Sequence, residues 1–264
     1  MRALIALAGI ALVSASYAQE PVRLYAAGSL RVALTDVAEE FACRTGVRVH
    51  GEFEPSGLLR ERIARGEPAE VFASANMEHP QALAAEGKGG PVVMFARNRL
   101  CALAAPHVRV TSDTLLERML DPKLKLGTST PKADPSGDYA WMLFARAEKV
   151  RPGAEAALSA KALKLTGGPD SPPPPKGRNA YAHVVSSGHA DIFLTYCTNA
   201  VLARKEVPAL QIVAIPDALA VGADYGMTVV QGARPEGLSF ALFLLSVPGQ
   251  EILGRHGFTT VSLP

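Results

Sequence analysis

The stretch VRLYAAGSLRVALTDVAEEF, residues 22–41, decides the fold class. It begins with an apolar run of β type over 22–27, turns at Gly28-Ser29 and continues with apolar residues at helical spacing, until Gly46 offers an end. The apolar residues on one stripe of that helix are Leu30, Leu34, Val37 and Phe41. The stretch therefore predicts a strand, a tight turn and a helix, which is the repeating unit of an α/β fold.

The same pattern recurs along the rest of the chain. Further runs of strand type cover 47–53, 70–75, 92–104, 124–130, 191–196, 210–215 and 225–232. Helical patterns separate most of these runs, which favours parallel α/β layers. A polar, proline-rich insertion at 167–179 interrupts the pattern, and its Pro172–Pro175 run predicts a rigid surface loop.

The order of these elements predicts two α/β lobes. The long run 92–104 leads from the first unit to the second, and the chain returns to the first unit near 222–228. We expect the first lobe to contain residues 19–100 and 226–264, and the second to contain residues 101–225.

The N-terminus predicts export. Residues 1–18 contain one basic residue, Arg2, then an apolar run too short to span a bilayer, and end in Ser16-Tyr17-Ala18, a small-x-small cleavage pattern. Cleavage after Ala18 would leave about 245 residues with scattered Lys and Arg and almost no net charge. Nothing in this distribution predicts binding to nucleic acid or to a membrane surface.

Three cysteines in an exported chain allow one disulfide and one leftover thiol. Spacing alone does not choose the pair, but Cys101 and Cys197 each adjoin a strand-like apolar run and are therefore favoured. Cys43 lies on a predicted helix and is expected to be a buried free thiol. No Cys or His spacing is typical of a zinc site, so no metal ion is predicted.

Small hydroxyl-and-glycine turns stand where three predicted helices begin. They are Gly28-Ser29, Ser56-Gly57 and Ser136-Gly137. Helix starts offer unpaired N–H groups and the positive end of the dipole, so such turns suit an anion, although serine is also an ordinary N-cap. Arg178 precedes a predicted helix and Tyr196 ends a strand; each has a solvated-loop or packing alternative.

The enzyme motifs in this sequence are incomplete or absent. Ser129-Thr-Pro-Lys132 matches the S-x-x-K pattern of penicillin-recognising enzymes, but Pro131 and Pro135 interrupt the helix that this motif needs. The chain has no G-x-S-x-G, H-E-x-x-H, P-loop or G-x-G-x-x-G motif. A secreted serine hydrolase is therefore a remote alternative, and no cofactor is predicted.

Five segments, in order, carry a resemblance to a known family. They are AAGSLRVALTDVAEEF, EPSGLLRERIARGEPAEVFASA, DPSGDYA, ADIFLTYCTNAV and LLSVPGQEILGRHGF. Together they resemble the periplasmic molybdate-binding proteins of ABC importers. That resemblance implies a type II periplasmic binding protein fold, with two α/β lobes, two hinge strands and a ligand cleft between them.

The resemblance also implies a ligand and its contacts. Family serine donors fall on Ser29 and Ser56, a backbone N–H falls on Ser136, the family tyrosine falls on Tyr196, and a further backbone donor falls near Arg178. The implied ligand is molybdate or tungstate, with sulfate, phosphate or a small carboxylate as alternatives. The implied protein is a periplasmic monomer that delivers its ligand to a membrane permease and has no catalytic residue. In related archaeal-type tungstate/molybdate proteins carboxylates reach the metal of the anion, which leaves open whether Asp134 faces the ligand.

Overall fold

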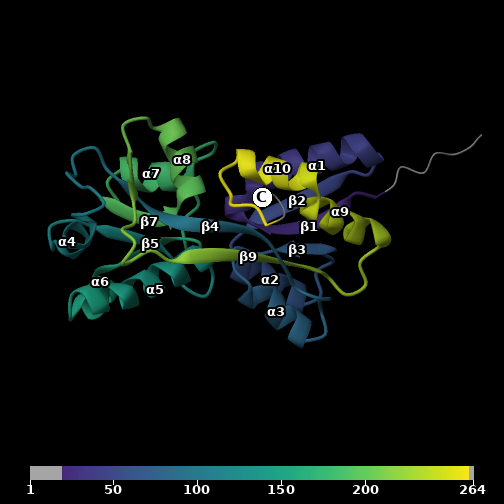
Figure 1. The fold of residues 1–264 in the computed structure, drawn as a ribbon, viewed down its shortest axis with the longest axis horizontal. Helices are drawn as coiled ribbons and strands as arrows, with labels where there is room; N and C mark the ends of the chain where they lie inside the picture. Colours follow the sequence, from purple (N-terminus) through teal and green to yellow (C-terminus); the bar gives the residue numbers. More distant parts are fainter. Residues whose placement is uncertain (1–19, 262–264) are drawn as a thin grey trace, which may run out of the picture.

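The computed structural model describes residues 20–261, and two lobes lie side by side along its longest axis (Figure 1). The predicted signal peptide lies outside these residues. β1 (Val22–Ala27) is followed by a 3-10 turn at Gly28–Leu30 and by α1 (Arg31–Thr45), which confirms the predicted strand, turn and helix. Gly46, with φ of 75°, ends α1 in the left-handed region that glycine tolerates.

The first lobe has a parallel core. β1 pairs in parallel with β2 (Val49–Glu54) on one side and with β3 (Val71–Ala73) on the other. Its helices are α1, α2 (Ser56–Ala64), α3 (Glu78–Ala85), α9 (Pro235–Leu245) and α10 (Val247–Arg255). The strands that begin this lobe therefore end at one edge, where α1 and α2 start.

The second lobe is also α/β. Its strands are β5 (Leu126–Ser129), β6 (Leu163–Thr166), β7 (Ile192–Tyr196) and β8 (Gln211–Ala214), and β5 pairs in parallel with both β6 and β7. Its helices are α4 (Leu115–Leu120), α5 (Pro135–Val150), α6 (Ala154–Lys161), α7 (Ala180–Ser186) and α8 (Cys197–Glu206). The sequence did not predict α6 and β6.

Two strands join the lobes. β4 (Val93–Ala104) pairs with β9 (Gly222–Val229) up to Arg99 and then with β7 and β8 from Leu100 onward. β9 also pairs with β3, so the sheet order is β2-β1-β3-β9-β4-β7-β5-β6. Figure 1 shows β4 and β9 running together from one lobe to the other. The residue boundaries of the lobes stay a prediction.

The favoured disulfide is present, but the prediction for the third cysteine is wrong. Cys101 of β4 and Cys197 of α8 form a disulfide, which confirms that pairing. The expected burial of Cys43 is wrong, because this thiol is exposed. Cys43 lies two positions after the buried Phe41, and two helical positions turn a side chain about 200° away from the core.

Helix length and composition bear on membrane insertion. Within residues 20–261 no single helix is long and apolar enough to cross a membrane, whereas α9 and α10, bent by 62°, pass that test only as a pair.

Candidate functional site

A cleft of about 280 Å³ lies where turns from the two lobes face each other. The first lobe contributes the segments that follow β1, β2 and β3. The second contributes the residue before α5, the ends of β6 and β7, the start of α7 and Pro174 of the proline-rich loop. The lining residues used below are Ser29, Glu54, Ser56, Ala75, Asp134 and Tyr196. In α/β sheets ligands bind at such carboxyl ends of strands.

Ser29 stands on the 3-10 turn after β1 and is half-buried. Its Oγ lies 3.0 Å from the hydroxyl of Tyr225 on β9, and Asn98 Nδ2 on β4 donates to the same phenol at 3.3 Å. Either hydroxyl can donate in the contact between Ser29 and Tyr225. When Tyr225 donates to Ser29, the Ser29 hydrogen is free for a ligand. The two strands that join the lobes thus orient this serine.

Ser56 begins α2 and is completely buried. The backbone N–H of Ala75 donates to its Oγ at 3.1 Å. Since no residue among 20–261 accepts the Ser56 hydroxyl hydrogen, that hydrogen remains for a ligand in the cleft.

Tyr196 ends β7 and brings the second lobe to the same cleft. Its side chain is buried, and its hydroxyl donates to the carbonyl of Ala75 in the first lobe at 3.3 Å. Burial, with the Tyr225 phenol nearby, holds the pKa of Tyr196 well above its ordinary value. The phenol therefore stays protonated and acts as a neutral donor at any physiological pH.

Ser136 does not line the cleft, but it follows the cleft residue Asp134 by two positions. Its N–H donates to Asp134 Oδ1 at 3.0 Å, its side chain is fully buried, and its Oγ has no hydrogen-bond partner in the described chain. Asp134 is thus the N-cap of α5, and it is Asp134 rather than Ser136 that lines the cleft. The Ser136 N–H that the family resemblance implies as a ligand donor is engaged by its own helix cap.

Asp134 is half-buried, yet burial raises the pKa of its carboxyl to about 6, against the lowering effect of the Ser136 N–H. No lysine or arginine among the described residues lines the cleft. An ionised Asp134 would repel an anion bound beside it, whereas a protonated one would donate to it. The protonation state of Asp134 therefore decides how well this cleft suits an anion.

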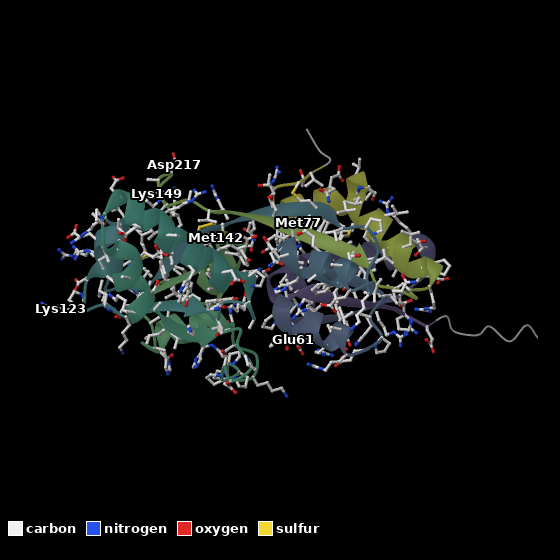
Figure 2. All side chains as sticks on the ribbon, turned by 90° about the horizontal axis from the view of Figure 1, so that it is seen from below. Glu61, Met77, Lys123, Met142, Lys149 and Asp217 are labelled. Carbon is white, nitrogen blue, oxygen red and sulfur yellow. A yellow bond between two sulfur atoms is a disulfide. The ribbon has the colours of Figure 1, made fainter. Side chains whose placement is uncertain are left out.

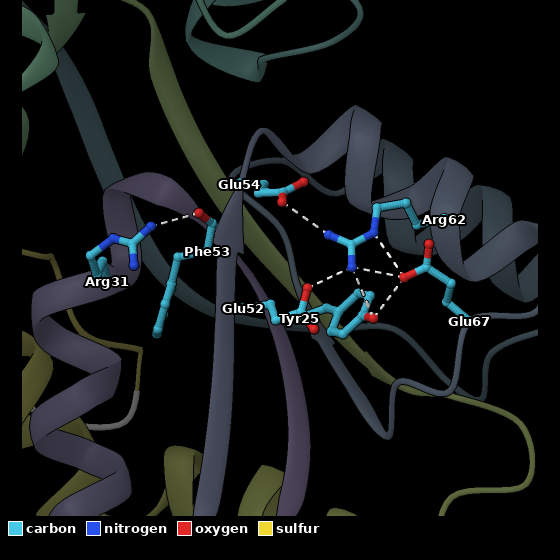
Figure 3. A network of polar contacts seen from close by, with 7 residues as sticks. All are labelled: Tyr25, Arg31, Glu52, Phe53, Glu54, Arg62 and Glu67. Carbon is cyan, nitrogen blue, oxygen red and sulfur yellow. Dashed lines mark hydrogen bonds and ion pairs between the residues drawn. The ribbon is translucent and has the colours of Figure 1, made fainter. Parts of the chain in front are cut away.

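The outer wall of the cleft on the β2 side is also acidic. Glu54 lines it and pairs with Arg62 at 3.0 Å. The same guanidinium also pairs with Glu52 and Glu67, and Tyr25 donates to Glu67 (Figure 3). Of these carboxylates only Glu54 lines the cleft, and Arg31, which donates to the Phe53 carbonyl at 2.7 Å, adds a second cation, so on this side three carboxylates face two guanidiniums.

Arg178 lies away from these residues. Its Nε donates to Glu206 Oε1 at 2.5 Å, its side chain is 41% exposed, and it is absent from the lining of the cleft. The adjacent N–H of Asn179 donates to the same carboxylate at 2.6 Å. The structure therefore brings Ser29, Ser56 and Tyr196 together and leaves Arg178 in an ion pair at the start of α7.

The lobes also touch through their backbones. The N–H of Gly57 donates to the carbonyl of Ala133 at 2.8 Å. A Cβ placed on Gly57 would lie 2.3 Å from the carbonyl oxygen of Lys132. Lys132 itself has φ of 69°, a left-handed conformation that a non-glycine residue seldom adopts. Glycine is therefore required at position 57 for this closeness between the lobes.

A larger cavity, of about 460 Å³, lies behind the proline-rich loop. Its lining includes Lys164, His183 and His189, and all of it comes from the second lobe. A hinge motion between the lobes would not close a cavity that lies within one lobe. Within residues 20–261 no group of three His, Cys, Asp or Glu side chains is arranged to hold a metal ion.

Tyr225 and Asn98 are the site residues that sequence reasoning missed. Both lie on the joining strands; Tyr225 contacts the cleft residues Ser29 and Tyr196, and Asn98 reaches the cleft through Tyr225. Their one signal in the sequence is that they are polar residues within strand runs, which does not specify partners that lie 196 positions away for Tyr225 and 127 or 100 positions away for Asn98.

Comparison with known proteins agrees with this architecture. The profile described as bacterial extracellular solute-binding protein matches residues 22–259. An uncharacterized protein of Pasteurella multocida (strain Pm70) is 38% identical over 239 residues, which cover 90% of this chain and 98% of that protein.

Two solved structures share the fold. The periplasmic molybdate-binding protein of Azotobacter vinelandii superposes with a TM-score of 0.71 at 16% identity, covering 92% of this chain and 99% of that one. The sulfate-binding protein SubI of Mycobacterium tuberculosis H37Rv gives 0.74 at 18% identity, covering 92% and 88%. The predicted type II periplasmic binding protein fold is confirmed. The profile match and the Pasteurella relative together show that the chain belongs to the bacterial extracellular solute-binding protein family.

Proposed function

We propose that this protein is exported to the periplasm by a cleaved signal peptide, captures a tetrahedral oxyanion between its lobes, and delivers it to the permease of an ABC importer. Molybdate or tungstate is the first candidate. The protein acts as a carrier and not as an enzyme. The single observation that carries the proposal is the convergence of the Ser29, Ser56 and Tyr196 hydroxyls, from both lobes, on one cleft.

The chemistry of these three groups suits an anion. Each is a neutral hydroxyl that can donate to an anion, Tyr196 by turning its hydrogen away from the Ala75 carbonyl, and hydrogen bonds to a charged acceptor are about twice as strong as bonds between neutral groups. A dianion loses several kcal/mol of hydration on burial, and fixed donors from two lobes recover that loss without reorganisation. Closure of the lobes completes the set and gives the permease a liganded shape to recognise.

The proposed roles differ among the predicted residues. Ser29 and Ser56 would hold the anion from the first lobe, and Tyr196 from the second. Ser136 would act through Asp134, whose conformation its N–H fixes. Arg178 would contribute at most from outside the cleft, since Glu206 already pairs with it.

A second candidate is a small organic anion such as a carboxylate or a phosphate ester. The cleft volume of about 280 Å³ lies near the lower end of small-molecule pockets, about 300 Å³, so the cleft admits such a ligand as well as a tetrahedral oxyanion. The SubI match keeps sulfate among the candidates as well.

Thermal unfolding of the mature protein against an anion panel tests the proposal. The panel is molybdate, tungstate, sulfate, phosphate and small carboxylates, each at equal ionic strength. An anion present at 100 times its dissociation constant adds roughly 2.7 kcal/mol to the free energy of unfolding. Stabilisation by molybdate or tungstate supports the first candidate, stabilisation by carboxylates alone supports the second, and no stabilisation by any anion contradicts the proposal.

A further inference from the structure

A second hollow, of about 410 Å³, adjoins the ligand cleft at Ser29. Ser29 lines both of them. From Ser29 this hollow, which we name the α8–α10 groove, passes Cys197 and Val201 to Lys205 on α8, with Arg255 at the end of α10 opposite. Cys197, Val201 and Lys205 are four residues apart and share one face of α8, so the groove is about 12 Å long.

The charge of this groove is one-sided. Arg99, Lys205 and Arg255 line it, and no aspartate or glutamate does so among the described residues. All three cations are exposed, and none has an ion-pair partner within residues 20–261. His256 also lines the groove, but its Nε2 already contacts Asp36 at 2.7 Å. The three cations therefore give the groove a positive potential, which the Asp36 carboxylate beside His256 offsets only in part.

The opposite approach to the cleft has the opposite charge. Glu54 and Asp134 line the cleft itself, and the carboxylates that share Arg62 lie on the β2 side (Figure 3). An anion that arrives from that side meets these carboxylates against the guanidiniums of Arg62 and Arg31, whereas the charged side chains that line the α8–α10 groove are all cations.

We propose that the α8–α10 groove is the entrance through which the anion reaches the cleft, and that Arg99, Lys205 and Arg255 accelerate its capture. This inference rests on the proposed function and concerns the rate of capture. Clefts lined by charge of one sign raise association rates by about 10- to 1,000-fold, and the effect falls steeply with ionic strength. Since the Debye length is about 30 Å at 0.01 M salt and about 8 Å at 0.15 M, charges at the far end of the groove act on an anion at Ser29 only in dilute salt.

Stopped-flow binding of molybdate, at 0.01 M and 0.15 M sodium chloride, tests the entrance. The groove variant is Lys205→Gln/Arg255→Gln, which leaves the strand residue Arg99 in place. The control variant, Lys123→Gln/Lys149→Gln, removes the same charge from exposed positions that lie on the outer side of the second lobe (Figure 2). We expect the groove variant to associate about three- to tenfold more slowly in dilute salt and to lose most of its salt dependence. Its dissociation rate and the rates of the control variant should remain those of the parent.

The proposed function is decided first, by equilibrium titration of the parent. A parent that binds molybdate, with equal association rates in the groove variant and the parent, would overturn the entrance and leave the function standing. A groove variant that only dissociates faster would make these cations direct ligand contacts, which also overturns it. If the association rate is unchanged but the groove variant delivers less anion to a reconstituted permease, the groove instead binds an acidic segment of the permease. That outcome also overturns the entrance. A parent that binds no anion would remove both proposals.

Discussion

Single hydroxyls carry the recognition that we propose. Ser56 is the most informative, because it is fully buried and its one recorded partner, the Ala75 N–H, occupies its oxygen and not its hydrogen. Ser29 differs in being half-buried and oriented by Tyr225. Each serine therefore combines a proposed ligand donor with a structural contact, to Tyr225 for Ser29 and to the Ala75 N–H for Ser56.

Ser29→Ala and Ser56→Ala should each weaken anion binding by about 1–3 kcal/mol, because a buried charged acceptor loses a donor. Ser56→Ala should also lower the free energy of unfolding, since the Ala75 N–H loses its acceptor. Isothermal titration gives the affinity and urea unfolding gives the stability. Arg178→Ala, whose parent side chain pairs with Glu206, should bind as the parent does. Unchanged affinity in both serine variants would remove them from the site.

Asp134 makes stability depend on pH in a predictable direction. Burial raises the pKa of its carboxyl to about 6, against about 3.9 in an unfolded chain. Between these values the folded protein holds a proton that the unfolded chain has lost, so the free energy of unfolding falls as pH rises from about 4 to about 6. Because Asp134 is only half-buried, we expect a loss of about 1–3 kcal/mol.

Asp134→Asn isolates this contribution. Asparagine is an equally good N-cap, so α5 should keep its start. Urea unfolding at four values of pH between 4 and 7 should show the variant gaining on the parent as pH rises. With sulfate as the probe, the parent should bind more weakly at pH 7.5 than at pH 5.5, and the variant should not change. Parallel pH profiles for the two proteins would show that Asp134 titrates normally.

Among the elements, the start of α2 and the loop before α5 contact each other through backbone atoms. Gly57→Ala would gain helix propensity but place a methyl group 2.3 Å from the Lys132 carbonyl oxygen. We expect the variant to fold, to close incompletely and to bind its anion at least about tenfold more weakly, since the donors of the two lobes no longer converge. Small-angle scattering with and without ligand measures closure. Gly222→Ala on β9, where an added Cβ meets nothing within 4 Å, is the matched control; equal closure in both variants would contradict the requirement for glycine.

The elements differ in how far their sequence predicts them. The strand, turn and helix over residues 22–46 were predictable because apolar spacing and a terminal glycine agree. α6 was not, since AEAALSAK has a single large apolar residue, Leu158, and therefore no visible stripe. Ser29, Ser56 and Tyr196 could be placed at strand ends from the sequence. That the Ser136 N–H is engaged by Asp134, and that Tyr225 orients Ser29, depends on tertiary contacts that spacing does not encode.

Across the whole molecule, the joining strands do more than connect the lobes. Asn98 on β4 and Tyr225 on β9 bond to each other, and Tyr225 reaches Ser29 of the first lobe while Asn98 donates to Thr198 of the second at 2.9 Å. A change in the angle between the lobes would therefore disturb the hydrogen bonds that orient a ligand donor. This contact chain gives a physical route by which ligand binding and hinge angle affect each other.

The disulfide acts on the whole chain, because Cys101 and Cys197 are separated by 96 residues. Closing a loop of about 100 residues lowers the entropy of the unfolded chain by an amount equivalent to about 4.7 kcal/mol, and measured losses on removal are typically about 2–5 kcal/mol. Cys101→Ala/Cys197→Ala should therefore lose about 2–5 kcal/mol in urea unfolding, whereas Cys43→Ala, at an exposed thiol, should change stability by less than about 0.5 kcal/mol. Reductant should destabilise the parent and leave the double variant unaffected. The unfolded parent, kept without reductant, should show one free thiol, that of Cys43. Three free thiols would contradict the disulfide.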